Sequence, residues 1–125
     1  MRLLRSDLAA PKGWLDGPWL SGLPISLGYA TAALDEPHEH ATITEIFLVG
    51  RGTVTANVDG SSIDLTCGDV LVVEPGEART ILRASDDLQM FVIHVAGGDG
   101  ELGNDKSIVE RSRLGLSSRP QPSPG

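Results

Sequence analysis

Hydrophobic and polar positions alternate in short runs through the middle of the chain, and turn residues separate the runs. Turn signals that recur about every 8–12 residues are typical of a β-sandwich or barrel. No window keeps a helical repeat of hydrophobic positions over about ten residues, so we expect little helix. We predict strands over the following segments: residues 25–34, 43–49, 52–58, 61–65, 69–74, 78–84 and 88–96.

The Asp59-Gly60 dipeptide is the strongest turn signal in this region. Both central positions of a two-residue hairpin turn favour a positive φ, which Gly adopts freely and Asp tolerates. The sequence therefore predicts a tight hairpin that joins the strands over 52–58 and 61–65. Together with the alternation, it predicts an all-β fold.

The two ends of the chain differ from this central part. Residues 1–24 contain proline and glycine too closely spaced for a helix or strand to persist, so we expect an irregular N-terminal arm. Trp14 and Trp19 lie in it, and we expect them to pack on the barrel or on a partner subunit. We therefore divide the chain into an arm (1–24), a β domain (25–96) and a C-terminal segment (97–125).

The C-terminal segment begins with a glycine-rich turn and contains a short extended stretch near residues 107–110. Its last nine residues are rich in serine and proline and lack the hydrophobic groups that would offset the entropy lost on ordering. We expect that tail to be frayed.

Composition narrows the possible functions. The 125 residues allow one domain with a modest core, and 40% hydrophobic residues with only 4% aromatic ones predict an aliphatic core. A net charge of −7 and no cluster of Lys and Arg argue against binding to nucleic acid. No hydrophobic run approaches the roughly 20 residues of a membrane helix. The single cysteine, Cys67, and a beginning without a signal-peptide core are consistent with a cytoplasmic protein.

His38, His40 and Glu45 are the clearest candidates for chemistry. Residues two apart on a strand point to the same face, so the two imidazoles share a face, and Glu45 can return to it after a short bend. Neutral imidazoles with a carboxylate suit divalent ions such as Fe, Mn, Ni or Zn. The alternative is a pair of surface histidines beside a proline turn.

The wider pattern resembles the cupins. The spacing His38-x-His40, four residues, Glu45, six residues, Gly52 is similar to the first cupin motif, and the stretch from Gly68 to Gly76 resembles the second. The resemblance covers about residues 25–96. It implies a double-stranded β-helix, which is a jelly-roll-like barrel of two antiparallel sheets with the ligand site in its mouth. It also implies that His38, His40 and Glu45 are the metal ligands of the first motif.

The chain departs from this pattern at Arg79. In metal-binding cupins the second motif supplies a third histidine, and the corresponding position here, three residues after Gly76, is Arg79. A guanidinium stays protonated and has no lone pair for a metal. Two unit charges about 4 Å apart interact by about 4 kcal/mol at an effective dielectric constant of about 20, so an inward Arg79 weakens the binding of a dication.

The sequence leaves three outcomes open. In the first, His38, His40 and Glu45 form a two-His-one-carboxylate site, and Arg79 holds an anionic substrate beside the metal. In the second, His94 on the last predicted strand replaces the missing ligand, although a lone histidine on such a strand is more often a core residue. In the third, Arg79 pairs directly with Glu45 and the pocket holds no metal.

Two functional hypotheses follow. One is a metalloprotein, enzyme or not, in which a divalent ion in the barrel acts on a small anionic or oxygenated substrate. The other is a metal-free module, similar to the sensor-like cupins, that binds a small ligand with Arg79 as the anion anchor. In both, we expect a homodimer that binds a small molecule and contacts neither nucleic acid nor a membrane.

Overall fold

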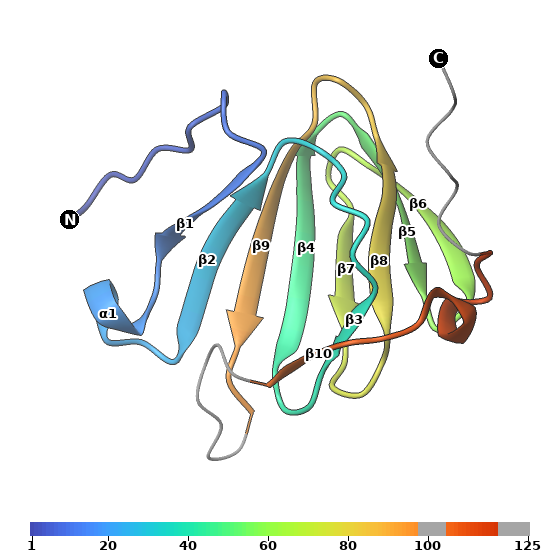
Figure 1. Ribbon diagram of the computed structural model, residues 1–125. Coiled ribbons are helices and arrows are strands. Elements are labelled where there is room, and N and C mark those ends of the chain that lie inside the picture. The colour runs from blue at the N-terminus through green and yellow to red at the C-terminus, as the bar shows by residue number, and fades with distance from the viewer. Residues whose placement is uncertain (98–104, 118–125) are drawn as a thin grey trace.

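The computed structural model describes residues 1–97 and 105–117, and these residues form two five-stranded antiparallel sheets that face each other (Figure 1). The first sheet has the order β1 (Lys12–Asp16), β2 (Ile25–Ala30), β9 (Gln89–Val95), β4 (Thr44–Arg51) and β7 (Val70–Val73). The second has the order β10 (Lys106–Ile108), β3 (His38–His40), β8 (Arg79–Ala84), β5 (Thr53–Val58) and β6 (Ser61–Thr66). The all-β prediction is confirmed.

Only short helical turns accompany the sheets in the described part of the chain. These are α1 (Pro18–Ser21) and the 3-10 turn η1 (Arg111–Leu114). Among the described residues, no helix has the length and the hydrophobic character needed to cross a membrane.

The core lies between the two sheets and is largely aliphatic, as the composition predicts. Val49 and Val73 from the first sheet and Val54 and Ala56 from the second are almost completely buried there. Phe47 is the aromatic member of this cluster. One end of the space between the sheets contains polar side chains instead, and this end is the candidate site described below.

The predicted Asp59-Gly60 hairpin is confirmed. Val58 pairs with Ser61, so the turn between β5 and β6 has two residues. Asp59 and Gly60 have φ values of 48° and 95°, and Asp59 is the only described residue other than glycine with a positive φ. The Asp59 carboxylate also accepts a hydrogen bond from the backbone N–H of Ala78, which ties this turn to the start of β8.

Three described strands lie outside the seven predicted strand ranges: β1, β3 and β10, the last of which overlaps the extended stretch expected near residues 107–110. β1 lies within residues 1–24, for which we expected no regular structure, and that expectation was wrong. β1 forms because it pairs with β2, and Gly13 leaves space for the Tyr29 ring, whose hydroxyl oxygen lies 2.7 Å from where a Cβ on Gly13 would be. β3 is only three residues long. In addition, β2 ends at Ala30, before the predicted limit of residue 34.

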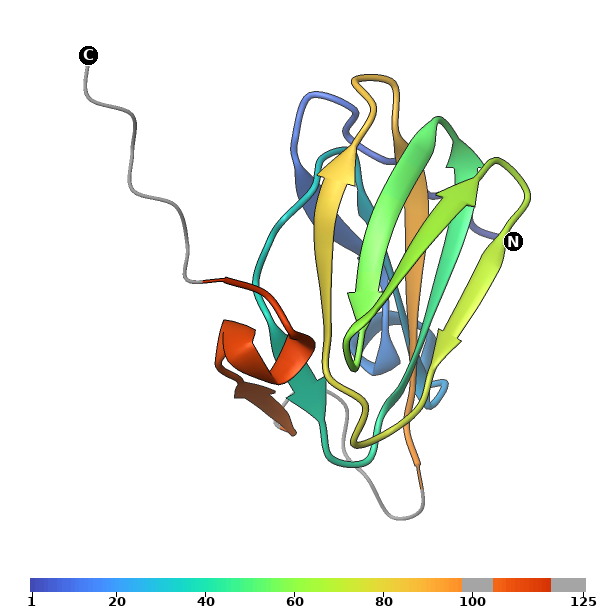
Figure 2. The same ribbon diagram turned by 90° about the vertical axis from the view of Figure 1, so that its right-hand side faces the viewer.

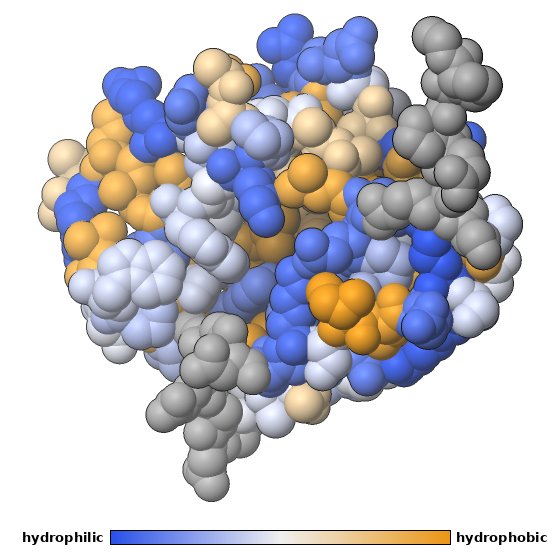
Figure 3. Space-filling model, viewed as in Figure 1, coloured by the Kyte–Doolittle hydropathy of each residue, from blue (hydrophilic) through white to orange (hydrophobic). Residues whose placement is uncertain are grey.

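The outer face of the first sheet is apolar as well as its inner face. Since Glu45, Phe47 and Val49 on β4 are buried, the alternating residues Ile46 and Leu48 point away from the core. The register places further apolar residues on the same side: Leu27, Val70, Val72, Phe91 and Ile93. Val70 and Val72 are 53% and 47% exposed. Hydrophobic residues also reach the surface near the N-terminal segment, as Figure 3 shows.

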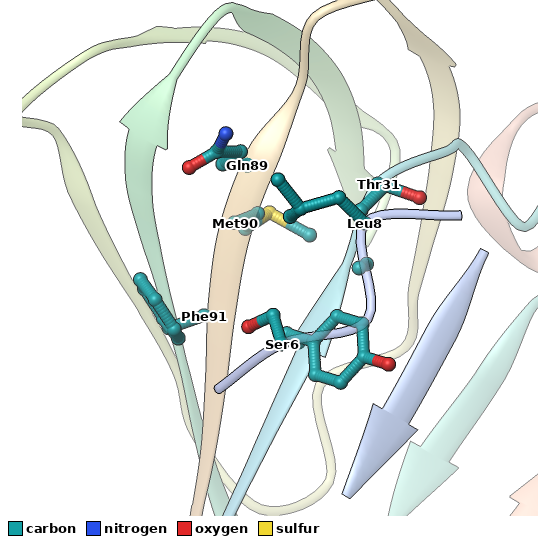
Figure 4. Close-up of a pocket in the computed structure, with 8 residues that line it drawn as sticks. Ser6, Leu8, Thr31, Gln89, Met90 and Phe91 are labelled. Atoms are coloured by element: carbon teal, nitrogen blue, oxygen red, sulfur yellow. The ribbon is translucent and has the colours of Figure 1, made fainter. Parts of the chain in front are cut away.

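The N-terminal segment covers part of this outer face. Ser6 and Leu8 lie beside Tyr29 and Phe91 and enclose a small hollow between the segment and β2 and β9 (Figure 4). The hollow has room for about one water molecule. We assign no chemistry to it.

Candidate metal centre

The predicted site residues come together at one end of the barrel, where several strands begin or end. β3 carries His38 and His40, Glu45 lies at the start of β4, and Arg79 and His94 lie at the start of β8 and near the end of β9. These strand ends lie at the lower edge of the molecule in Figure 1. The structure thus brings together every residue that the sequence singled out for the site.

Alternation along β3 orients its side chains as expected. His38 and His40 both point toward Glu45, with ring centroids 5.2 Å apart. Glu39 between them points away and accepts a hydrogen bond from Nη1 of Arg113 over 2.7 Å. The backbone of β3 is also tied to the second motif, because the N–H of Gly76 donates to the carbonyl oxygen of His40 over 2.8 Å.

The spacing of the donor atoms fits a shared ion. One donor atom from each of His38, His40 and Glu45 can be chosen so that all three lie within 4.8 Å of one another. Nε2 of His38 is 3.9 Å from Oε1 of Glu45, and Nε2 of His40 is 3.9 Å from Oε2. Ligand atoms that each lie about 2.1 Å from one ion are at most about 4.2 Å apart. Small side-chain movements would therefore complete a coordination site.

The hydrogen bonds of the two imidazoles determine their tautomers. Nδ1 of His38 lies 2.6 Å from the carbonyl oxygen of Glu36, and Nδ1 of His40 lies 2.8 Å from Oδ1 of Asp105. A carbonyl oxygen and an ionised carboxylate only accept, so each Nδ1 carries the hydrogen. Burial lowers the pKa of His38 below its usual value, which keeps this ring neutral at neutral pH. Nε2 of His38 therefore presents its lone pair toward Glu45, and Nε2 of His40 does so in the neutral ring.

Asp105 is a site residue that the sequence analysis did not identify. Burial raises the pKa of Asp105, but the hydrogen bonds from His40 and from the backbone N–H groups of Thr42 and Ile43 outweigh it and hold the pKa well below its usual value. The only signal was the short extended stretch near residues 107–110, which corresponds to β10 at Lys106–Ile108. Nothing in the spacing related that stretch to His40.

Glu45 is buried and surrounded by positive or hydrogen-donating groups. Burial raises its pKa, whereas the hydrogen bond from His94 and the charge of Arg79 lower it, and the net effect is a pKa below the usual value. Nε2 of His94 donates to Oε2 of Glu45 over 2.5 Å. Oε1 has no hydrogen-bond partner within the described residues. Glu45 therefore stays ionised and keeps one oxygen free to bind a ligand.

Arg79 points inward and is only 1% exposed. Its Nη2 donates to the carbonyl oxygen of Glu74 over 3.2 Å, and its Nη1 lies 3.8 Å from Oε1 of Glu45. Burial lowers the pKa of Arg79, and the charge of Glu45 partly restores it. Nε and Nη1 have no hydrogen-bond partner in residues 1–97 or 105–117. The guanidinium thus has two donor groups to offer to a ligand.

These contacts bear on all three outcomes that the sequence left open. Arg79 and Glu45 are near each other without a direct hydrogen bond, and His94 contacts Glu45. A fourth-ligand role for His94 stays a prediction, because its Nε2 is used by Glu45 in this arrangement. Trp14 covers the same side of the site, with its ring centroid 5.1 Å from that of His94.

Comparisons with known proteins agree with this fold. The family model for the cupin domain matches residues 28–96. The chain belongs to the cupin family. A search among curated proteins gave no match for this cupin.

Solved structures share the fold. A cupin protein from Bacteroides fragilis is 23% identical, covers 81% of this chain and 91% of its own, and has a TM-score of 0.59. KdgF from Halomonas sp. is 15% identical, with 70% and 79% covered and a TM-score of 0.58. A variant of Pac13 from Streptomyces, determined with uridine, is 8% identical, with 87% and 92% covered and a TM-score of 0.63.

Pac13 is described as a nucleoside dehydratase. In two further Pac13 structures this cupin spans 67% and 66% of the chain, with TM-scores of 0.57 and 0.55. At such identities the likeness concerns the fold, because one fold carries many unrelated activities.

Proposed function

We propose that this cupin binds one divalent metal ion through His38, His40 and Glu45 and presents it to a small anionic or oxygenated substrate. The observation that carries this proposal is the set of unused donor atoms. Nε2 of His40 and Oε1 of Glu45 are buried without a hydrogen-bond partner among the described residues. A buried polar atom left unpaired costs free energy, and a bound ion would remove that cost at both atoms.

The charges of the side chains around the site favour the binding of a cation and then of an anion beside it. With Glu45 and Asp105 ionised and Arg79 protonated, the charges of these three side chains sum to one negative charge. A divalent ion would change that sum to one positive charge. The free N–H groups of Arg79 could then hold a carboxylate or phosphate oxygen beside the ion.

A bound ion of this kind would act as a Lewis acid or would activate water or O₂. The donor set is compatible with Fe, Mn, Ni or Zn. The residues of the chain have separate tasks around it. His94 holds Glu45 in place by a hydrogen bond and can pass a proton at Nε2, Arg79 orients the anionic group, and Trp14 shields His94 from solvent.

A second candidate is a metal-free protein that binds a small anion. One observation favours it: the charge of Arg79 and the hydrogen bond from His94 already stabilise the Glu45 carboxylate. In that case Arg79 alone would anchor the ligand. The barrel would then act as a binding module.

Metal analysis distinguishes the two candidates. Protein purified without chelator should contain close to one equivalent of metal, and His38→Ala and His40→Ala should each remove most of it. Glu39→Ala is the matched control, because Glu39 lies on the same strand and points away from the site. Metal that stays far below one equivalent, or that both histidine variants retain, would exclude the metalloprotein and favour the metal-free module.

A further inference from the structure

We propose that Asp105 is a positioning residue of this site, which sets the tautomer of His40, and that the C-terminal segment 105–117 holds the ligand strand β3 in place. For its effect on metal binding, this inference rests on the proposed function. Its statement about the tautomer of His40 depends only on the hydrogen bonds of Asp105.

The Asp105 carboxylate is held rigidly. Its Oδ2 accepts hydrogen bonds from the backbone N–H groups of Thr42 and Ile43, both at 2.9 Å. These two bonds direct the other oxygen, Oδ1, at Nδ1 of His40, 2.8 Å away. Since the backbone donors belong to the turn between β3 and β4, Asp105 ties this turn to the ring of His40.

The consequence for His40 is chemical as well as geometric. An acceptor at Nδ1 keeps the hydrogen there and leaves the lone pair on Nε2, which is the atom that lies 3.9 Å from Glu45. Loss of such an outer partner typically costs 10–100-fold in metal affinity.

The rest of the C-terminal segment fastens β3 to the barrel. β3 makes one pair with β8, His38 with Arg79, whereas all three of its residues pair with β10. Figure 2 shows β10 and η1 beside β3 at the edge of the second sheet. Leu114 in η1 is buried, and its carbonyl oxygen accepts a hydrogen bond from Asn57 over 3.2 Å. Further polar contacts join Lys106 to Glu36 and Arg113 to Glu39.

Asp105→Asn is the sharpest test. The Asn carbonyl oxygen can keep the bonds to the backbone N–H groups of Thr42 and Ile43, which turns its NH₂ group toward Nδ1 of His40. Nδ1 must then accept, and the ring hydrogen moves to Nε2. Asp64→Asn is the matched control, because it makes the same carboxylate-to-amide change at an exposed residue of β6 that contacts Thr55 and no imidazole.

Two measurements are made on each protein. The first is the ¹⁵N NMR spectrum of the histidine rings after treatment with chelator, which reports the tautomer without any metal. The second is the affinity for Zn²⁺ by calorimetric titration. We expect the hydrogen of His40 on Nδ1 in the wild type and in Asp64→Asn, and on Nε2 in Asp105→Asn, together with a loss of about 10–100-fold in Zn²⁺ affinity for Asp105→Asn alone.

The outcomes separate this inference from the proposed function. A wild-type His40 with its hydrogen on Nε2, or an Asp105→Asn protein with the wild-type tautomer, overturns the positioning role. If Asp105→Asn does not fold, the wild-type spectrum decides. If the wild type binds no Zn²⁺ but the tautomer reverses in Asp105→Asn, the proposed metal function fails while the control of His40 by Asp105 is supported.

Discussion

Nη1 of Arg79 lies 3.8 Å from Oε1 of Glu45, and neither atom has a hydrogen-bond partner in the described part of the chain. The two charges therefore attract each other without forming the close pair that would block the site. At 3.8 Å no ligand atom fits on the line between them, so a ligand must lie beside the pair, against the carboxylate oxygen and the guanidinium N–H groups. A ligand that bridges them must offer a cation to Glu45 and an anionic oxygen to Arg79.

Replacing Arg79 by histidine should strengthen metal binding. Arg79→His removes a positive charge close to the ion and supplies a fourth donor at the position where metal-binding cupins have one. Two unit charges about 4 Å apart at a dielectric constant of about 20 interact by about 4 kcal/mol, and a dication feels about twice that repulsion from Arg79. We therefore expect at least a tenfold gain in Zn²⁺ affinity. Calorimetric titration measures it.

Arg83→His on the same strand is the control for this gain. Arg83 is exposed, so the substitution changes net charge and adds a histidine without entering the barrel. An Arg79→His protein that binds Zn²⁺ no better than Arg83→His would show that the Arg79 position does not face the ion.

The stability of the metal-free protein should fall on acidification. Burial lowers the pKa of His38 from its ordinary value of 6.5, so the unfolded chain binds a proton that the folded chain resists. The free energy of unfolding therefore decreases as the pH falls through about 6.5, by at most about 1.4 kcal/mol per pH unit for this one group. Below the ordinary values of Glu45 and Asp105, 4.5 and 3.8, it decreases further, because folding lowers both pKa values.

Thermal unfolding of chelator-treated protein tests the direction of this change in stability with pH. Tm should be lower at pH about 5.5 than at pH about 7.5, and the difference should be smaller in His38→Gln. A Tm that rises on acidification, or an unchanged slope in His38→Gln, would contradict this account.

The tryptophans should report metal binding directly. The sequence contains two, Trp14 and Trp19, whose ring centroids lie 6.5 Å apart, and Trp14 also contacts His94. A paramagnetic ion such as Co²⁺ quenches nearby indole fluorescence, whereas Zn²⁺ does not. We expect Co²⁺ to quench the wild type, and Trp14→Phe to lose more of the quenching than Trp19→Phe. Equal quenching of free tryptophan and protein would mean that the ion binds elsewhere.

The exposed face of the first sheet should mediate a homodimer. Val70 and Val72 lie beside other apolar residues on this face, and a second copy is the partner that we predicted from the sequence. Val72→Glu would place a charge in that interface and should weaken dimerisation by at least about tenfold. Light scattering after size-exclusion chromatography gives the mass, with Ser62→Glu on the exposed part of β6 as the control. A monomeric wild type would exclude the dimer.

The sequence predicted the barrel well where local signals and burial agree. The Asp59-Gly60 turn and the alternation along β4 to β9 are encoded within a few residues of each element, so period-2 patterning identifies them. β1 was missed because its glycine and flanking prolines disfavour a strand locally. It is stabilised by pairing with β2, which lies in a different part of the sequence.

The site likewise contains residues that local sequence places and contacts that depend on the pairing of distant strands. His38, His40 and Glu45 lie within eight residues, so their common face follows from strand geometry. The meeting of Glu45 with His94 depends on the register between β4 and β9, and that of His40 with Asp105 depends on the pairing of β3 with β10. Neither pairing can be derived from spacing, because the partners are 49 and 65 residues apart.

The backbone hydrogen bond from Gly76 to His40 joins the two cupin motifs directly. The carbonyl oxygen of His40 is held by the turn that follows β7, and its ring is held by Asp105 from the C-terminal segment. Two stretches of chain that supply no donor atom to the proposed metal site therefore both fix the position of His40. If the proposed ion binds, natural variation in either stretch would change how tightly it is held while the three donors stay the same.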